Sequence, residues 1–245
     1  MTTPTSDRGR KASFVLGALG LVALAATMIL GLSLPGTREQ SDYSRLIAIH
    51  PPIAWCAYLA VGVCALASAL YLIPRTRSRR WDRIAVSSAE VGVVFIGLTL
   101  ATGSIWGRPT WGVWWTWDAR LTVTAIMFAT FLGYLAVRRA IAGVDARARV
   151  SAIVAVLGSI SIPINHMAVE WWRTLHQGRS LAQADPSSTL DGAFIATMLL
   201  GMVAMTLVYA WLVIQRYGLE VLDEQAGTEG LEAALVARRA EGQLV

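Results

Sequence analysis

Long apolar runs separated by short polar segments dominate the hydrophobic pattern of the chain. A helix needs about 20 consecutive apolar residues to cross a bilayer, and six runs come close to that length. They cover residues 14–34, 53–73, 84–105, 121–137, 150–169 and 192–214. The pattern predicts an all-α integral membrane protein with six transmembrane helices.

The fifth run is the least regular of the six, because polar residues and a proline lie close to its end. Ser159, Ser161, Pro163, Asn165 and His166 all fall within it. Proline lacks the backbone donor that a helix interior needs, and polar side chains in a span tend to face a polar space. We expect this helix to break near its end or to line a polar cavity.

The composition supports a membrane protein. The 245 residues are 55% hydrophobic and 15% charged, with a mean hydropathy of +0.53, which is more apolar than a soluble domain of this size. The first run has 21 residues, longer than the ~7–15 of a signal peptide, so we expect it to be retained. Residues 1–217 form the predicted transmembrane domain, and 218–245 are predicted to form a cytoplasmic amphipathic helix.

The basic residues predict the orientation, because Lys and Arg near spans are enriched on the cytoplasmic side. Fifteen of the 21 Lys and Arg residues lie in the N-terminus, the second loop, the fourth loop and the C-terminal tail. The other side holds six: Arg38, Arg45, Arg108, Arg120, Arg173 and Arg179. Both termini are therefore predicted to be cytoplasmic. The net charge of +5 reflects this topology and not nucleic-acid binding.

Tryptophan is concentrated in the third loop, residues 106–120, which is predicted to lie outside. The run Trp111-Gly-Val-Trp-Trp-Thr-Trp-Asp118 includes Trp114, Trp115 and Trp117. In a helix, the first, fourth, fifth and eighth residues of this run would share one face. Seven of the ten tryptophans lie in this loop and in the fifth outer loop, 170–191, whereas an aromatic belt spreads over both interfaces. We predict a flat aromatic platform.

All three histidines also fall on the outer side. His50 precedes two prolines at the start of the second span, His176 lies in the fifth outer loop, and His166 lies near the end of the fifth span. A lone interfacial histidine is usually structural, and we keep that interpretation for His166. His50 and His176 stand beside aromatic residues and arginines, a combination that suits a flat iron-containing ligand such as haem.

The arginines close to these residues suit the anionic edge of such a ligand, because guanidinium groups bind carboxylates. Arg45 lies five residues before His50, and Arg120 lies two residues after Asp118. Asp118 has a simpler interpretation as a helix cap or as a local partner of Arg120 or Arg173. Cys56 and Cys64 form no C-x-x-C-H motif, so covalent haem attachment to this chain is not encoded.

The tryptophan run closely resembles the WGxWWxWD motif of the WWD haem-handling proteins of cytochrome c biogenesis. Within that group, the six spans, His50 before Pro-Pro and the run Val169-Glu-Trp-Trp-Arg-Thr-Leu-His-Gln-Gly178 resemble the CcmC family, haem exporter protein C. The resemblance covers about residues 44–217. The relative CcmF is much longer, and the CcsA/ResC type lacks this length and the match in the fifth loop.

The resemblance implies a haem-presenting scaffold and not an enzyme. It implies a multi-pass protein of the bacterial inner membrane that holds haem b on the periplasmic side and presents it to the haem chaperone CcmE, with CcmD and the ATPase module CcmA/CcmB as further partners. It implies His50 and His176 as the axial iron ligands. The other expected haem-binding residues are Trp111, Trp114, Trp115, Trp117, Asp118, Arg45 and Arg120.

Two other function classes stay open on the residues alone. A membrane b-type cytochrome for electron transfer would carry histidine pairs within its spans, stacked across the bilayer. A substrate transporter with an aromatic gate would show internal repeats and helices interrupted near the midplane. Glu90 is the only carboxylate inside a predicted span; it is a functional candidate by default, and the simpler expectations are that it snorkels to the interface or pairs with Arg83.

Overall fold

A computed structural model describes residues 7–37, 40–176 and 192–242, and this part of the chain is helical apart from loops and one isolated bridge between Thr37 and Ser41. A short 3-10 helix, η1 (Asp42–Ala48), precedes α2. The α-helices are α1 (Asp7–Ser33), α2 (His50–Leu72), α3 (Arg79–Trp111), α4 (Ala119–Ala140), α5 (Val144–Gly158), α6 (Ser161–Trp171) and α7 (Gly192–Gly242). Within these described ranges, six candidate spans are long and apolar enough to cross a membrane, which confirms the predicted fold class.

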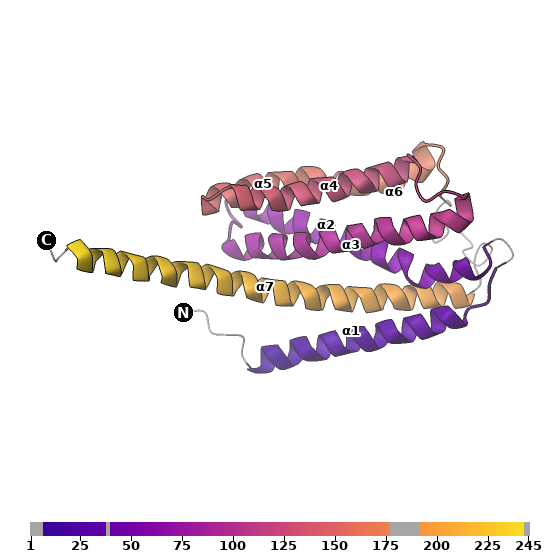
Figure 1. The fold of residues 1–245 in the computed structure, drawn as a ribbon, viewed down its shortest axis with the longest axis horizontal. Coiled ribbons are helices and arrows are strands. Elements are labelled where there is room, and N and C mark those ends of the chain that lie inside the picture. The colour runs from indigo at the N-terminus through magenta and orange to yellow at the C-terminus, as the bar shows by residue number, and fades with distance from the viewer. Residues whose placement is uncertain (1–6, 38–39, 177–191, 243–245) are drawn as a thin grey trace.

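The fifth span is broken, which was one of the two alternatives expected from the sequence. The helix stops at Gly158 and restarts at Ser161. Pro163 sits in the first turn of α6, where it lacks the N–H that would bond to the carbonyl of Ser159. The carbonyl of Ser159 accepts from the N–H of Ile162 instead, and the hydroxyls of Ser159 and Ser161 donate to the carbonyls of Val156 and Gly158. α6 lies at the end of the bundle opposite the start of α1 (Figure 1), which is the end predicted to lie outside and is called the outer end below.

Two helices extend well past the predicted spans. α3 continues to Trp111 and ends at Gly112, whose φ of 81° is left-handed, a conformation that favours glycine. α7 continues as one helix to Gly242, so α1 begins and α7 ends on the same side of the bundle (Figure 1). The side chains of α7 from residue 231 onward lie outside the described residues, and the predicted amphipathic face of the tail stays a prediction.

Small residues bring the helices together. A Cβ on Gly201 of α7 would lie 2.7 Å from Cγ of Pro52, and one on Gly92 of α3 would lie 3.0 Å from Cβ of Ala60. Such close approach between backbones is typical of helix packing in membranes. α1 packs along α7 at the edge of the bundle (Figure 1), where Gly17 faces the Trp211 ring. The contacts at Gly201 hold α7 against the first turn of α2, next to His50.

Ion pairs join the helices toward the inner end of the bundle. The buried pair Arg138–Asp82 joins α4 to α3 at 2.6 Å. Glu90 pairs with Arg216 of α7, so its predicted pairing with Arg83 is wrong. Arg83 pairs instead with Glu224 at 2.7 Å. The reason is tertiary, because the continuous α7 carries Arg216 and Glu224 alongside α3.

Candidate functional site

A cavity of about 460 Å³ lies at the outer end of the bundle, between α2, α3, α4, α6 and α7. This volume falls within the range of small-molecule and cofactor sites. Its lining is mostly apolar and extends inward to Met127, eight residues into α4, or about 12 Å along that helix. The cavity is therefore set into the spanning helices, deeper than a platform formed by the outer loops.

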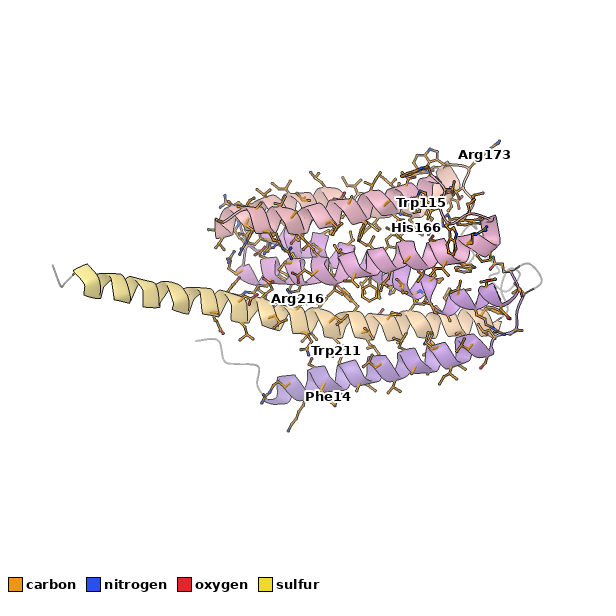
Figure 2. The ribbon with its side chains drawn as sticks, viewed as in Figure 1. Phe14, Trp115, His166, Arg173, Trp211 and Arg216 are labelled. Carbon is orange, nitrogen blue, oxygen red and sulfur yellow. The ribbon has the colours of Figure 1, made fainter. Side chains whose placement is uncertain are left out.

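All three histidines line this cavity. His50 is the first residue of α2, His166 lies on α6, and His176 follows α6. His50 is within electrostatic range of both His176 and Arg120. In Figure 2, His166 lies at the same end of the bundle as Trp115 and Arg173, and the Arg216 side chain lies far from them. The structure therefore brings together His50 and His176, which lie 126 positions apart in the sequence.

The surroundings of His50 fix which ring nitrogen is available. Its Nδ1 lies 2.9 Å from Oγ1 of Thr102, whose own hydroxyl proton is donated to the carbonyl of Leu98 at 2.7 Å. A hydroxyl that donates to Leu98 accepts from Nδ1, so this geometry favours the tautomer with the proton on Nδ1 of His50 and the lone pair on Nε2. Gly103 allows this packing, since a Cβ there would lie 3.0 Å from Cε1 of His50.

His176 lies against Trp111 and Asp118. Its ring centroid is 4.8 Å from that of Trp111, in an edge-to-face arrangement. Its Nδ1 is 3.4 Å from Oδ1 of Asp118 and makes no hydrogen bond within the described residues. Burial and, to a smaller extent, Arg120 lower the pKa of His176 to about 4, although Asp118 raises it. The imidazole is therefore neutral at pH 7 and able to act as a metal ligand.

Arg120 is the cation of the cavity lining, at the start of α4. A buried polar network lies behind it and connects α2, α4 and α6. The Tyr58 hydroxyl donates to Oδ1 of Asn165 at 3.0 Å, and the Asn165 amide donates to Oγ1 of Thr124 at 2.7 Å and to the carbonyl of Arg120 at 3.3 Å. Asn165 is fully buried, and its bonds fix the side of α6 that faces the cavity.

The predicted helical platform of tryptophans is wrong in its geometry. α3 ends at Trp111 and α4 begins at Ala119, so the residues between them form a loop and share no helical face. Trp111 lines the cavity, whereas Trp114 and Trp117 are 60% and 78% exposed. Trp115 packs edge-to-face on Trp117 with the ring centroids 5.5 Å apart. The tryptophans thus divide between the cavity wall and the outer surface.

Two further predicted residues lie off the lining of this cavity. Asp118 is the N-cap of α4 and accepts from the N–H of Arg120 at 2.9 Å. This agrees with its simpler interpretation as a helix cap. Arg45 borders a neighbouring cavity, with its Nε donating to the carbonyl of Leu34 at 2.8 Å and Nη2 3.2 Å from the carboxylate of Asp42. Arg38, Arg179 and most of the loop 170–191 lie outside the described residues.

Several residues of the cavity lining were not predicted from the sequence. Thr99, Gly103, Trp106 and Thr110 lie on one side of α3 and border the cavity. Their spacing of i, i+4, i+7 and i+11 marks a single helical face, and it is recognisable once α3 is extended to Trp111. Tyr58, Met127 and Met198 also line the cavity, with no signal in the sequence that separates them from core residues.

The histidines of the cavity suit a metal whose equatorial ligands come from a bound macrocycle and not from the protein. No group of three or more His, Cys, Asp and Glu side chains that could hold a bare metal ion occurs among the described residues. Iron in a porphyrin needs only axial ligands from the protein, and histidine supplies them commonly. Two neutral imidazoles on a large apolar cavity with one arginine fit that requirement.

Comparison with known proteins gives a consistent result. A family model described as "Heme exporter protein C" matches residues 6–232. A protein of that name from Haemophilus influenzae is 35% identical over 217 residues, which cover 88% of this chain and 87% of the relative. Another from Bradyrhizobium diazoefficiens is 36% identical over 84% of this chain and 78% of the relative. A putative cytochrome c biosynthesis ccmC-like mitochondrial protein from Marchantia polymorpha is 37% identical over 61% of this chain and 62% of its own length.

Proposed function

Because the chain belongs to the Heme exporter protein C family, we propose that it binds haem at the outer end of its bundle and presents it to the haem chaperone CcmE during c-type cytochrome maturation. One observation carries the proposal. His50 and His176 line the same cavity, and each has its Nδ1 facing an oxygen of a neighbouring side chain. Metal-bound histidines typically direct their other ring nitrogen at such a partner.

Each ring nitrogen has a separate role in this proposal. Nδ1 faces Thr102 in His50 and Asp118 in His176, and Nε2 of each ring ligates the iron. Arg120 takes the propionates, because it is the cation on the lining and guanidinium groups bind carboxylates well. The apolar lining contacts the macrocycle, with Trp106 and Trp111 on the α3 side. The haem is haem b, held without a covalent bond to this chain.

The exposed tryptophans form the surface on which we propose that CcmE binds. Trp114 and Trp117 expose most of their surface next to the cavity wall formed by Trp111. Exposed aromatic residues are enriched where proteins bind one another, and CcmE must reach a haem edge to form its bond. We assign this loop to CcmE, and CcmD and the CcmA/CcmB module to the same complex. The protein then acts as a scaffold in the bacterial inner membrane, with the cavity facing the periplasm.

Electron transfer across the bilayer is less consistent with the site. A membrane cytochrome that moves electrons from one face to the other needs haems stacked along its spans, whereas His50, His166 and His176 all line one cavity. These are the three histidines of the sequence. The chain therefore supplies histidine ligands at one depth, as a protein that loads and presents a single haem requires.

The test is the optical spectrum of the detergent-purified protein supplied with haem, before and after dithionite. We expect a six-coordinate spectrum in the wild type, and its loss in both His50→Ala and His176→Ala. His166→Ala is the matched control, because it removes an imidazole from the same lining, and it should keep the six-coordinate spectrum. Absence of haem binding in the wild type would overturn the proposal, and an unchanged spectrum in either axial variant would overturn the ligand pair.

A further inference from the structure

Asp118 joins two segments that lie far apart in sequence. Its Oδ1 accepts from the N–H of Arg120 at 2.9 Å and thereby caps α4. Its Oδ2 accepts from the N–H of Leu175 at 2.7 Å, next to His176. The same Oδ1 lies 3.4 Å from Nδ1 of His176. The carboxylate therefore holds the start of α4 and the segment with the second histidine together.

Helix capping alone does not account for this arrangement. An N-cap needs one side-chain oxygen, and serine, threonine or asparagine would serve as well. The Asp118 side chain is 3% exposed, and burying a full negative charge is costly unless that charge is well partnered. The second oxygen accepts from the N–H of Leu175, and the first also lies 3.4 Å from Nδ1 of His176. Asp118 is absent from the cavity lining, so it does not meet a ligand there.

The hydrogen bond of Leu175 to Asp118 and the ring contact of His176 with Trp111 link the segment 173–176 to other elements. α6 ends at Trp171, and the N–H of Trp172 makes the last backbone hydrogen bond of that turn, to Ala168. For residues 173–176, the hydrogen bond from Leu175 to Asp118 is the one that reaches another element within the described chain. His50, by contrast, is part of a helix and packs on Thr102 and Gly103. The two histidines are thus positioned by different means.

We propose that Asp118 is a positioning residue, which ties the segment 173–176 to the start of α4 and aims the His176 imidazole at the cavity. The inference rests on the proposed function, in which His176 is an iron ligand. With Nε2 on the iron, the proton lies on Nδ1, which faces the carboxylate.

The variant Asp118→Ser keeps the cap of α4 and removes the contacts of Asp118 with Leu175 and His176. Serine caps a helix as well as aspartate does, but it has no second oxygen for Leu175 and no charge for His176. We expect the unfolding temperature in detergent to change little, haem affinity to fall about 10- to 100-fold, as for other partners of metal-bound histidines, and the six-coordinate fraction to fall toward that of His176→Ala. Asp145→Ser, at an exposed acid in the first turn of α5, is the control and should leave the spectrum unchanged.

Double variants make the test specific. Because Asp118 acts through His176, Asp118→Ser should weaken haem binding no further in a His176→Ala background, and it should add its full effect in a His50→Ala background. Equal effects in both backgrounds would show a general structural role and overturn the inference. If His176→Ala loses the six-coordinate spectrum and Asp118→Ser keeps it, the inference fails and the proposed function stands. An unchanged spectrum in His176→Ala would instead refute the ligand pair.

Discussion

At the scale of single residues, one hydroxyl decides how His50 presents its ring. Thr102 donates its only proton to the carbonyl of Leu98 and so accepts from Nδ1 of His50. This arrangement favours the tautomer with the proton on Nδ1 and the lone pair on Nε2. The sequence shows that a histidine precedes two prolines, but it cannot show that a threonine 52 positions later selects the tautomer.

Thr102→Val tests this role, because valine keeps the shape of the side chain and removes the acceptor. The His50 ring then loses the partner that fixes its proton on Nδ1, and we expect haem to bind about 10-fold more weakly or worse, with a broadened spectrum. Equilibrium haem titration measures the change. Thr99→Val, one turn earlier on the same helix and also on the lining, is the control. Equal affinities in both variants would argue against selection of the tautomer by Thr102.

At the scale of elements, the site depends on how closely α7 approaches the first turn of α2. A Cβ on Gly201 would lie 2.7 Å from Cγ of Pro52, 3.0 Å from the carbonyl oxygen of Ala48 and 3.1 Å from Cγ2 of Thr27. Gly201 therefore permits α1, α2 and α7 to meet at one point. The hydrophobic pattern predicted each of these helices, but it does not contain the distance between them.

Gly201→Ala should force α7 away from α2 and destabilise the bundle. Overpacking of this kind costs about 1–3 kcal/mol, and the displaced turn of α2 carries His50, so we also expect weaker haem binding. Thermal unfolding in detergent measures the stability. Gly62→Ala is the matched control, since a Cβ at that position in α2 meets nothing within 4 Å, and it should be neutral or stabilising by about 0.5–1 kcal/mol. The prediction fails if both variants are equally stable.

At the scale of the whole molecule, the outer end combines a cavity and an exposed aromatic surface. Trp111 borders the cavity, and Trp114 and Trp117 point outward from the loop that follows it. A haem in the cavity and a partner on the loop would therefore lie side by side. The inner end is instead held together by ion pairs between α7 and α3.

Tryptophan substitutions separate these two surfaces. We expect Trp117→Leu, which is 78% exposed in the wild type, to keep the wild-type haem spectrum and to slow transfer to CcmE at least several-fold, because hot-spot aromatic residues carry much of the energy of an interface. Trp111→Leu should alter the haem spectrum itself. The measurements are the optical spectrum and the amount of covalent CcmE–haem formed. Full transfer in a Trp114→Leu/Trp117→Leu variant would show that the loop serves only as a membrane anchor.

The sequence by itself determined the number of spans, because this number is recorded in local periodicity, and it limited the end of the fifth span to a break or a polar lining. It did not determine that α3 continues to Trp111, since Trp, Gly, Arg and Pro at 106–109 interrupt the apolar pattern while the backbone stays helical. Only the tertiary structure decided that Glu90 meets Arg216, that Arg45 borders a different cavity from Arg120, and that Asp118 holds the segment of His176. These are contacts between helices, and their distances depend on how closely side chains and glycines let the backbones approach, which no single segment encodes.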